Sequence, residues 1–253
     1  MEHGRWKVTP LIVCGDVHRF DMAGRLVHID PDRRATGPSR SIRVEDYVPG
    51  LEYLQNLTET ARGGAIKLSP ASNFGGKFND VEIELISWKG ECKEATIWFG
   101  ELAGESNFRA TVLPAGESIS GDPLDEITDV TEPGQYLLDP DTAVVRAGLV
   151  DRLGRELNVT RLDASEEYLT AGSPVTSPFV QTFEILEILP NQPRAIRDYF
   201  RNSDIGQLEI KCRHVPTQVE SWRKQLTLPG DQPGVLFFAR LQGKTKAVIA
   251  RRV

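Results

Sequence analysis

The sequence is poor in cysteine and has no long apolar run. Its three cysteines, Cys14, Cys92 and Cys212, lie far apart, form no CxxC pair, and have no histidine at a spacing that would complete a zinc or iron–sulfur site. A disulfide framework is therefore excluded, and we expect no metal site. No apolar stretch approaches the roughly 18 residues that span a bilayer, and residues 1–6 contain no apolar signal region. We expect a cytoplasmic protein that does not enter a membrane.

The remaining composition is that of a globular protein with an uneven charge distribution. The chain has 253 residues, of which 40% are hydrophobic and 26% are charged, which excludes a disordered chain and a miniprotein. The net charge is −6, but residues 201–253 hold ten Lys or Arg and four Asp or Glu, a net of +6, which leaves −12 for residues 1–200. A basic tail on an acidic body favours contact with a polyanion, and a solvated basic surface is the alternative.

An acidic segment divides the chain in two. Residues 113–134 contain six acidic residues, no basic ones, and several Pro and Gly, so they offer little apolar surface for a core. We predict a first domain over residues 1–113, a linker over 114–133 and a second domain over 134–253.

The first part has the pattern of a parallel α/β fold. Three short apolar runs are continuous rather than alternating, as in strands covered on both faces of a parallel sheet. They are residues 11–13, 26–29 and 65–68. A helix is expected over about 49–62, with Gly63-Gly64 as its stop. Alternation in 81–85 and the run 95–99 predict an antiparallel hairpin that turns at Lys89-Gly90.

The second part has the pattern of an α+β domain. A helix is expected to open with Asp139 as N-cap and Pro140 at its first position. A second helix begins at Thr217, which forms a capping box with Glu220, and a shorter one covers about 193–201. The inward residues of the first helix are Val144, Ala147, Val150 and Leu153. Strands are expected around 179–188, 207–212, 234–240 and 246–252, the last two joined at Gln242-Gly243.

Two aspartates directly follow expected strands. Asp16 comes after the run 11–13 and Asp30 after the run 26–29. Ligands of open α/β sheets bind at the carboxyl ends of the strands, so both positions are candidate functional sites. Each aspartate can instead cap the turn that follows its strand, and this alternative stays open.

Several segments resemble one known family. A strand ending in Gly15-Asp16, followed by one ending in Asp30-Pro31-Asp32-Arg33-Arg34, resembles the later motifs of class I S-adenosylmethionine-dependent methyltransferases. The hairpin at 81–99 is also what that fold uses to finish its sheet. Further segments resemble a bacterial group of these methyltransferases that carries a THUMP-like C-terminal domain. They are Glu45-Asp46-Tyr47, Lys67-Leu68-Ser69-Pro70, Pro140 through Val150, Leu208-Glu209-Ile210-Lys211 and the chain end.

The resemblance implies a partial Rossmann-like methyltransferase sheet, an α+β THUMP-like domain and S-adenosylmethionine as the cofactor. It places Asp16 at the adenine amino group of that cofactor. Asp30 and Pro31 would line the methyl-transfer site and hold a nucleophilic base nitrogen. Five further residues would contact the substrate. The two arginines among them would bind its phosphates, and the alternative is that they only lie in an exposed loop. The five residues are Arg33, Arg34, Lys67, Ser69 and Pro70.

The glycine-rich turn of that family is absent from the sequence. The pair Gly75-Gly76 follows the run 65–68, which is the wrong place for it. We therefore expect that the chain lacks the N-terminal cofactor-binding half, binds S-adenosylmethionine poorly and is inactive by itself. Whether the chain alone is an enzyme stays open.

The basic C-terminal segment suggests RNA as a binding partner of the protein. On the expected strand at 208–213, Lys211 and Arg213 point away from the apolar face, as a partly basic exposed surface would require. We expect weak, salt-dependent binding of a structured RNA such as tRNA or rRNA. The predicted surface comprises Lys211, Arg213, Arg223, Lys224, Lys244 and Lys246. The alternative is a non-enzymatic module that binds RNA or protein, with self-association through an exposed sheet edge.

Overall fold

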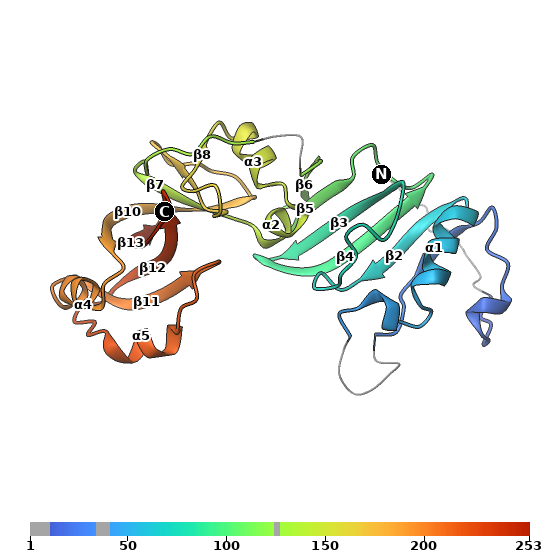
Figure 1. Cartoon of the computed structure of the whole chain (residues 1–253), viewed down its shortest axis with the longest axis horizontal. Coiled ribbons are helices and arrows are strands. Elements are labelled where there is room, and N and C mark those ends of the chain that lie inside the picture. Colours follow the sequence, from blue (N-terminus) through green and yellow to red (C-terminus); the bar gives the residue numbers. More distant parts are fainter. Residues whose placement is uncertain (1–10, 34–40, 124–126) are drawn as a thin grey trace, which may run out of the picture.

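A computed structural model describes residues 11–33, 41–123 and 127–253. It contains two mixed sheets, which lie side by side along the longest axis of the molecule, with helix α2 between them (Figure 1). The fold class is therefore the predicted combination of α/β and α+β elements. None of the described helices is both long and apolar enough to cross a membrane.

The first sheet has six strands in the order β1-β2-β4-β3-β5-β6. Its parallel pairs are β1 with β2 and β3 with β5, and its other neighbours are antiparallel. The strands are β1 (Leu26–Ile29), β2 (Gly63–Leu68), β3 (Val81–Trp88), β4 (Glu91–Gly100), β5 (Phe108–Leu113) and β6 (Glu117–Gly121). The predicted hairpin is confirmed as β3 and β4, with Lys89 and Gly90 at positive φ in its turn.

The second sheet has seven strands in the order β11-β12-β13-β10-β7-β9-β8. They are β7 (Tyr136–Pro140), β8 (Thr160–Arg161), β9 (Leu169–Ala171), β10 (Val180–Pro190), β11 (Ile205–Cys212), β12 (Gln232–Leu241) and β13 (Lys244–Arg252). The four strands expected in this part and the turn at Gln242-Gly243 are confirmed.

The helices are short. They are the 3₁₀ turns η1 (Val17–Arg19) and η2 (Val44–Asp46), and the α-helices α1 (Leu51–Thr60), α2 (Thr142–Ala147), α3 (Val150–Glu156), α4 (Pro193–Arg201) and α5 (Val219–Gln225). The helix predicted over 49–62 is α1, which buries Leu54 and Leu57. Its predicted stop is wrong, because Gly63 and Gly64 already belong to β2.

The expected strand at 11–13 does not form. Leu11 and Ile12 are 90% and 88% exposed, and no strand of the described residues pairs with them. A strand is stable only where a neighbour completes its hydrogen bonds, so apolar composition alone could not make one here. The strand at 26–29 does form, but at the sheet edge, and Leu26 is exposed rather than covered on both faces. In contrast, β2 is buried along almost its whole length, as expected.

Of the three helices predicted in the second part, the one at 193–201 is α4, and the starts of the other two are shifted. Asp139 and Pro140 lie in β7, where Asp139 pairs with Gln181, and Asp141 caps α2 by accepting a hydrogen bond from the Ala143 amide. Thr217 forms no capping box, because its hydroxyl donates to the Val215 carbonyl and α5 starts after Gln218. In each case, pairing or a competing local hydrogen bond decided the boundary.

Part of the expected linker is structured. Residues 117–121 form β6, which pairs with β5 at the edge of the first sheet. The helix predicted with Val144, Ala147, Val150 and Leu153 inward is two helices, broken at Gly148, where φ is +73°. All four residues are buried in the same hydrophobic cluster as the first sheet. Helix α2 thus packs on β3, β4 and β5 of that sheet, although it follows the expected linker, and α3 packs against α2 and β8.

Candidate functional site at the carboxyl edge of the first sheet

Four strands of the first sheet end at the same edge. Because β4 is antiparallel to both β2 and β3, the strands β1, β2, β3 and β5 all run in one direction. Their carboxyl ends carry the segments at Asp30, Ser69, Lys89 and Pro114. This is the edge at which open α/β sheets bind ligands.

The predicted methyl-transfer residues meet at this edge. The Lys67 ammonium lies 3.0 Å from an Asp30 carboxylate oxygen and 3.9 Å from Glu94. The hydrogen bond from Lys67 to Asp30 is the main reason why the pKa of Lys67 is raised. Pro31 is buried beside them, and Arg33 is close enough to oppose that pKa rise electrostatically. The structure therefore groups Asp30, Pro31, Arg33 and Lys67, whereas Arg34 lies outside the described residues.

Helix α2 contacts the loop that follows β2. Arg146 Nε donates to the Pro70 carbonyl at 2.6 Å, and another guanidinium nitrogen donates to the Ser72 carbonyl at 3.1 Å. The same guanidinium stacks 5.2 Å from the centre of the Phe74 ring. Ser69 accepts a long hydrogen bond from the Ala71 amide. Arg146 holds the predicted substrate wall at Ser69 and Pro70 against α2, a role that the sequence pattern did not indicate.

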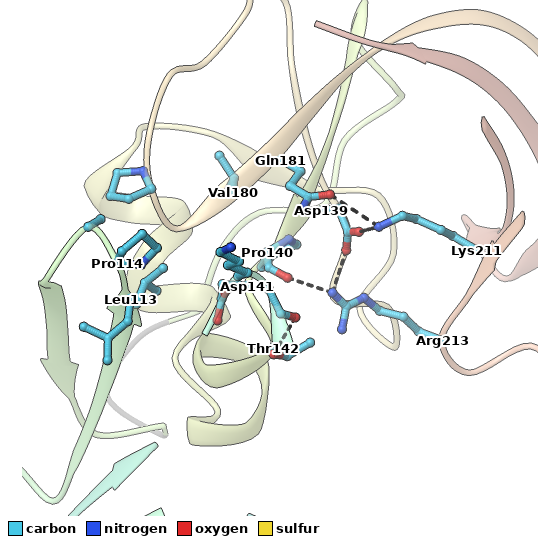
Figure 2. A pocket seen from close by; sticks show the side chains of 15 residues that line it. Leu113, Pro114, Asp139, Pro140, Asp141, Thr142, Val180, Gln181, Lys211 and Arg213 are labelled. Atoms are coloured by element: carbon cyan, nitrogen blue, oxygen red, sulfur yellow. Dashed lines mark hydrogen bonds and ion pairs between the residues drawn. The ribbon is translucent and has the colours of Figure 1, made fainter. Parts of the chain in front are cut away.

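A cavity of about 660 Å³ lies further along the same edge. Figure 2 shows apolar side chains such as Leu113 and Pro114 on one side and the charged groups of Asp139, Lys211 and Arg213 on the other. The lining residues come from the β3–β4 turn, the end of β5, the junction of β7 and α2, β10 and the end of β11. A volume of this size, with one apolar wall and a few polar groups, suits a ligand of nucleotide size.

The charged wall of this cavity is an ion-pair network centred on Asp139. The carboxylate lies 2.7 Å from Lys211 Nζ and 2.6 Å from an Arg213 guanidinium nitrogen. The same guanidinium donates to the Pro140 carbonyl at 2.8 Å, but its Nε is buried without a partner among the described residues. Burial would lower the pKa of Arg213, but the Asp139 carboxylate outweighs burial and the pKa is raised.

This network corrects the expected exposure of Lys211 and Arg213. Their side chains are only 21% and 18% exposed, because β11 brings them over β7 and its carboxylate. The alternation itself is right, since Ile210 and Cys212 point to the apolar core of the C-terminal part. Strand periodicity predicts the face of the sheet on which a side chain lies, but it does not predict which other residues cover that face.

The other predicted RNA-contacting residues remain near the surface. Arg223 is exposed and pairs with Glu220 at 2.9 Å. Lys224 and Lys244 are exposed and Lys246 is half-buried, and none of the three forms an ion pair within the described residues. Among the described residues, these three are the cations of the predicted surface that have no ion pair.

Asp16 lies in a local turn. Its carboxylate accepts hydrogen bonds from the His18 amide at 3.1 Å and the His18 ring at 2.8 Å, and these bonds lower the pKa of Asp16. The capping alternative therefore describes the structure. In the described residues no strand precedes Asp16, so the structure does not place this carboxylate at the carboxyl end of a sheet strand, where the resemblance expects the adenine contact.

Comparisons with known proteins agree with the fold and the edge. Residues 180–252 match the family model of the THUMP domain-like family. Two strains of Mycobacterium tuberculosis each have an uncharacterized S-adenosylmethionine-dependent methyltransferase that is 35% identical over 220 residues, which is 85% of this chain and 60% of the relative. A crystal structure of a protein assigned as a methyltransferase from Porphyromonas gingivalis W83 superposes with a TM-score of 0.72 at 19% identity, covering 90% of this chain and 59% of that one.

These findings confirm the resemblance stated from the sequence. The chain is a homologue of S-adenosylmethionine-dependent methyltransferases and carries a THUMP-like domain. The P. gingivalis structure supports the fold alone. The chain spans about 60% of the length of the curated relatives that it matches.

Proposed function

We propose that this chain is the substrate-binding part of an RNA methyltransferase. The observation that carries the proposal is the shared carboxyl edge of β1, β2, β3 and β5, which brings Asp30, Lys67 and the 660 Å³ cavity to one side of the sheet. The homology to methyltransferases and the THUMP-like domain support the same conclusion. The three cysteines carry free thiols, and we propose the cytoplasm as the place of action.

Asp30 and Pro31 are the proposed contacts of the acceptor base. The Asp30 carboxylate is paired with Lys67 but still exposed to solvent, so it can also accept a hydrogen bond from an exocyclic amino group. Arg33 stands next to Lys67, where a guanidinium can bind the phosphate of that nucleotide. The neighbouring nucleotide follows the edge past Ser69 and Pro70 towards the cavity.

We do not expect this chain alone to bind S-adenosylmethionine. The sequence has no strand, glycine-rich turn and helix in series, and in the described residues Asp16 does not follow a sheet strand. We expect isothermal titration calorimetry to detect no micromolar binding of S-adenosylmethionine. Micromolar binding would contradict this expectation and assign a cofactor site to the chain itself.

Crosslinking tests the RNA-binding edge. The full chain is irradiated with a structured tRNA transcript at low salt, and the crosslinked peptides are identified by mass spectrometry. We expect crosslinks in the peptides around residues 30–33, 67–70 and 113–115. Crosslinks confined to the opposite edge of the first sheet, or no complex at low salt, would overturn the proposal.

The second candidate is a protein-binding module, and the exposed edge of β1 favours it. Leu26 on this edge strand is 48% exposed, and no strand pairs with the outer side of β1 among the described residues. Light scattering on the purified chain, together with an RNA-binding assay, distinguishes the two candidate functions. A concentration-dependent dimer without RNA binding supports the module, and a monomer that binds RNA supports the methyltransferase part.

A further inference from the structure

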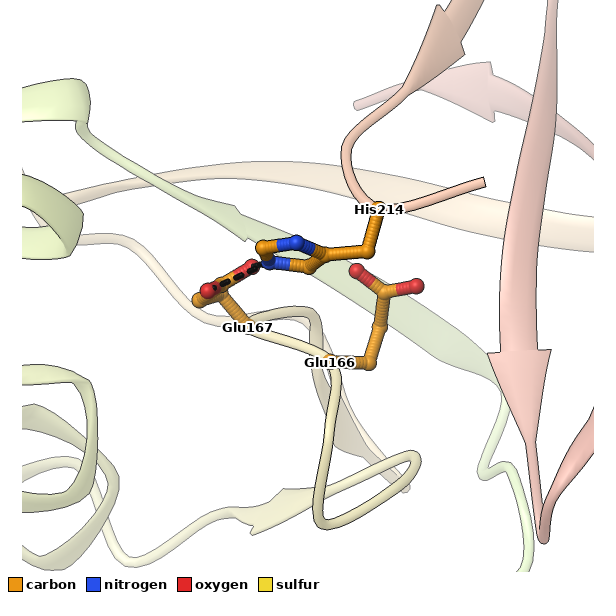
Figure 3. Close-up of side chains that lie close together, drawn as sticks. All are labelled: Glu166, Glu167 and His214. Atoms are coloured by element: carbon orange, nitrogen blue, oxygen red, sulfur yellow. Dashed lines mark hydrogen bonds and ion pairs between the residues drawn. The ribbon is translucent and has the colours of Figure 1, made fainter. Parts of the chain in front are cut away.

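Three metal-ligating side chains meet outside the proposed RNA-binding edge. Glu166 and Glu167 lie in the loop between β8 and β9, and His214 follows the end of β11. A histidine ring nitrogen and one oxygen from each carboxylate lie within 4.8 Å of one another. Figure 3 shows the two carboxylates on either side of the imidazole ring. His214 is 47 residues away from Glu167 in the sequence, so motif spacing could not indicate this cluster.

Glu166 is the unusual member of the cluster. Its side chain is fully buried, and one carboxylate oxygen accepts a hydrogen bond from the Arg240 amide at 3.0 Å. The other oxygen, Oε1, is buried and has no hydrogen-bond partner in the structure. Buried polar atoms in folded proteins almost always have a partner. Arg213 is a nearby cation, but one of its terminal nitrogens binds Asp139 and Pro140, and its buried Nε forms no hydrogen bond to Glu166.

An ion pair alone explains only part of this arrangement. The His214 Nε2 atom lies 2.6 Å and 2.5 Å from the two Glu167 oxygens, which satisfies these two side chains. It leaves the Glu166 oxygen without a partner. A divalent cation would bind all three groups and balance the charge of the two carboxylates. One imidazole with two carboxylates suits Zn²⁺ or Mn²⁺, whereas Mg²⁺ and Ca²⁺ prefer oxygen ligands alone.

We propose that Glu166, Glu167 and His214 bind a divalent transition-metal ion, with Zn²⁺ as the expected ion. Three protein ligands leave at least one position for water. The ion would connect the β8–β9 loop, which precedes the THUMP-like residues 180–252, to the end of β11 within them. None of the three side chains lines the cavity of the proposed RNA-binding edge, although His214 directly follows Arg213, which does. The role of the ion in the fold is a structural link between two segments.

Metal titration of the full, untagged chain tests the site. After treatment with EDTA and removal of the chelator, ZnCl₂ is titrated by calorimetry and Co²⁺ binding is followed by visible absorption. We expect one ion per chain with a dissociation constant in the micromolar range or below. The Co²⁺ spectrum should lack a thiolate charge-transfer band, and such a band would overturn the proposal by assigning the ion to a cysteine.

Three variants separate the site from nonspecific binding. His214→Ala and Glu166→Gln should each weaken Zn²⁺ binding at least tenfold. His18→Ala is the matched control, because His18 also pairs with a carboxylate, Asp16 at 2.8 Å, but belongs to no such three-residue cluster among the described residues. It should bind like the wild type. If a site variant does not fold, the wild type alone still decides the question, because Zn²⁺ must raise its melting temperature. The proposal fails if wild type and His214→Ala bind alike, or if wild type shows neither binding nor a thermal shift.

Discussion

Asp139 is a nearly buried carboxylate that pairs with two cations. Its side chain is 9% exposed, and it has Lys211 at 2.7 Å and Arg213 at 2.6 Å. Removal of a partner from a buried ion pair is costly because the remaining charges keep their desolvation penalty. We expect Asp139→Asn to reduce the free energy of unfolding by about 3 kcal/mol, measured by guanidinium unfolding.

An exposed pair on the same part of the chain provides the control for Asp139. Arg223 and Glu220 lie 2.9 Å apart on α5, and both side chains are more than half exposed. Exposed pairs are weak because water screens them, so Glu220→Gln should change stability by less than about 1 kcal/mol. Equal effects of the two substitutions would mean that the Asp139 network is solvated in solution.

Cys92 is predicted to be an unreactive thiol. Burial is the main reason why its pKa is raised from 9.0 to about 11, with Asp141 adding to the effect. Only the thiolate reacts with iodoacetamide, so at pH 8 the shift lowers the reactive fraction of Cys92 about a hundredfold. The exposed Cys14 should therefore be alkylated first, as measured by peptide mass spectrometry.

The pH dependence of the alkylation tests the cause. The raised pKa disfavours the thiolate, so the alkylation rate of Cys92 should keep rising as the pH approaches 11. In denaturant the difference from Cys14 should disappear, because burial is lost. Fast alkylation of Cys92 in the folded chain at pH 8 would contradict the burial of its thiol.

At the level of elements, the packing of β2 depends on glycine. A Cβ atom on Gly64 would lie 2.2 Å from the Val27 carbonyl oxygen and 2.6 Å from the Phe99 ring. Since backbone cannot yield as a flexible side chain can, Gly64→Ala should separate β1 from β2. We expect a loss of about 1–3 kcal/mol and faster hydrogen exchange of the β1 amides.

Gly75 offers a matched substitution for Gly64→Ala. A Cβ atom there would meet nothing within 4 Å, and its φ is not in the left-handed region. Gly75→Ala should leave the thermal unfolding curve within about 0.5 kcal/mol of wild type. If Gly64→Ala is equally silent, the close approach of β1 and β2 does not exist in solution.

These elements also show what the sequence could predict. Alternation and helical spacing are local, so the β3–β4 hairpin, α1 and the strands β10 to β13 were predicted correctly. Strands β8 and β9 were not predicted, and the end of β7 was mistaken for a helix start. Residues 11–13 failed because strand formation depends on a neighbour, which no local pattern describes. Gly63 and Gly64 were misread as a helix stop, since a glycine needed for close approach and one needed for a turn look the same in sequence.

For the whole molecule, the candidate site was predictable only in part. Asp30 was found because it follows a strand, and Lys67 was named from the family resemblance. Parallel pairing of β1 and β2 brings the two side chains together. The cavity was not predictable, because its walls come from five separate segments. Arg146 and Asp139 gained their roles from contacts with residues more than 70 positions away.

Most cations of residues 201–253 form ion pairs within the fold, although the net charge of +6 already counts the carboxylates of Asp204, Glu209 and Glu220. The paired cations include Lys211, Arg213, Arg223, Arg251 and Arg252. Only unpaired cations release bound counterions fully when RNA replaces water at their surface. RNA binding by this part should therefore depend on Lys224, Lys244 and Lys246.

A triple variant tests this surface through the salt dependence of binding. Substitution of Lys224, Lys244 and Lys246 by Gln should lower the slope of log affinity against log salt by about two to three, because each phosphate contact contributes about 0.7 to 0.9. The measurement is fluorescence anisotropy with a labelled structured RNA. A control with the same charge change substitutes Arg62, Lys93 and Arg194, which face Glu101, Glu91 and Asp198. The control should lower the slope by less than one. Equal slopes for the two variants would mean that net charge, and not this surface, determines the affinity for RNA.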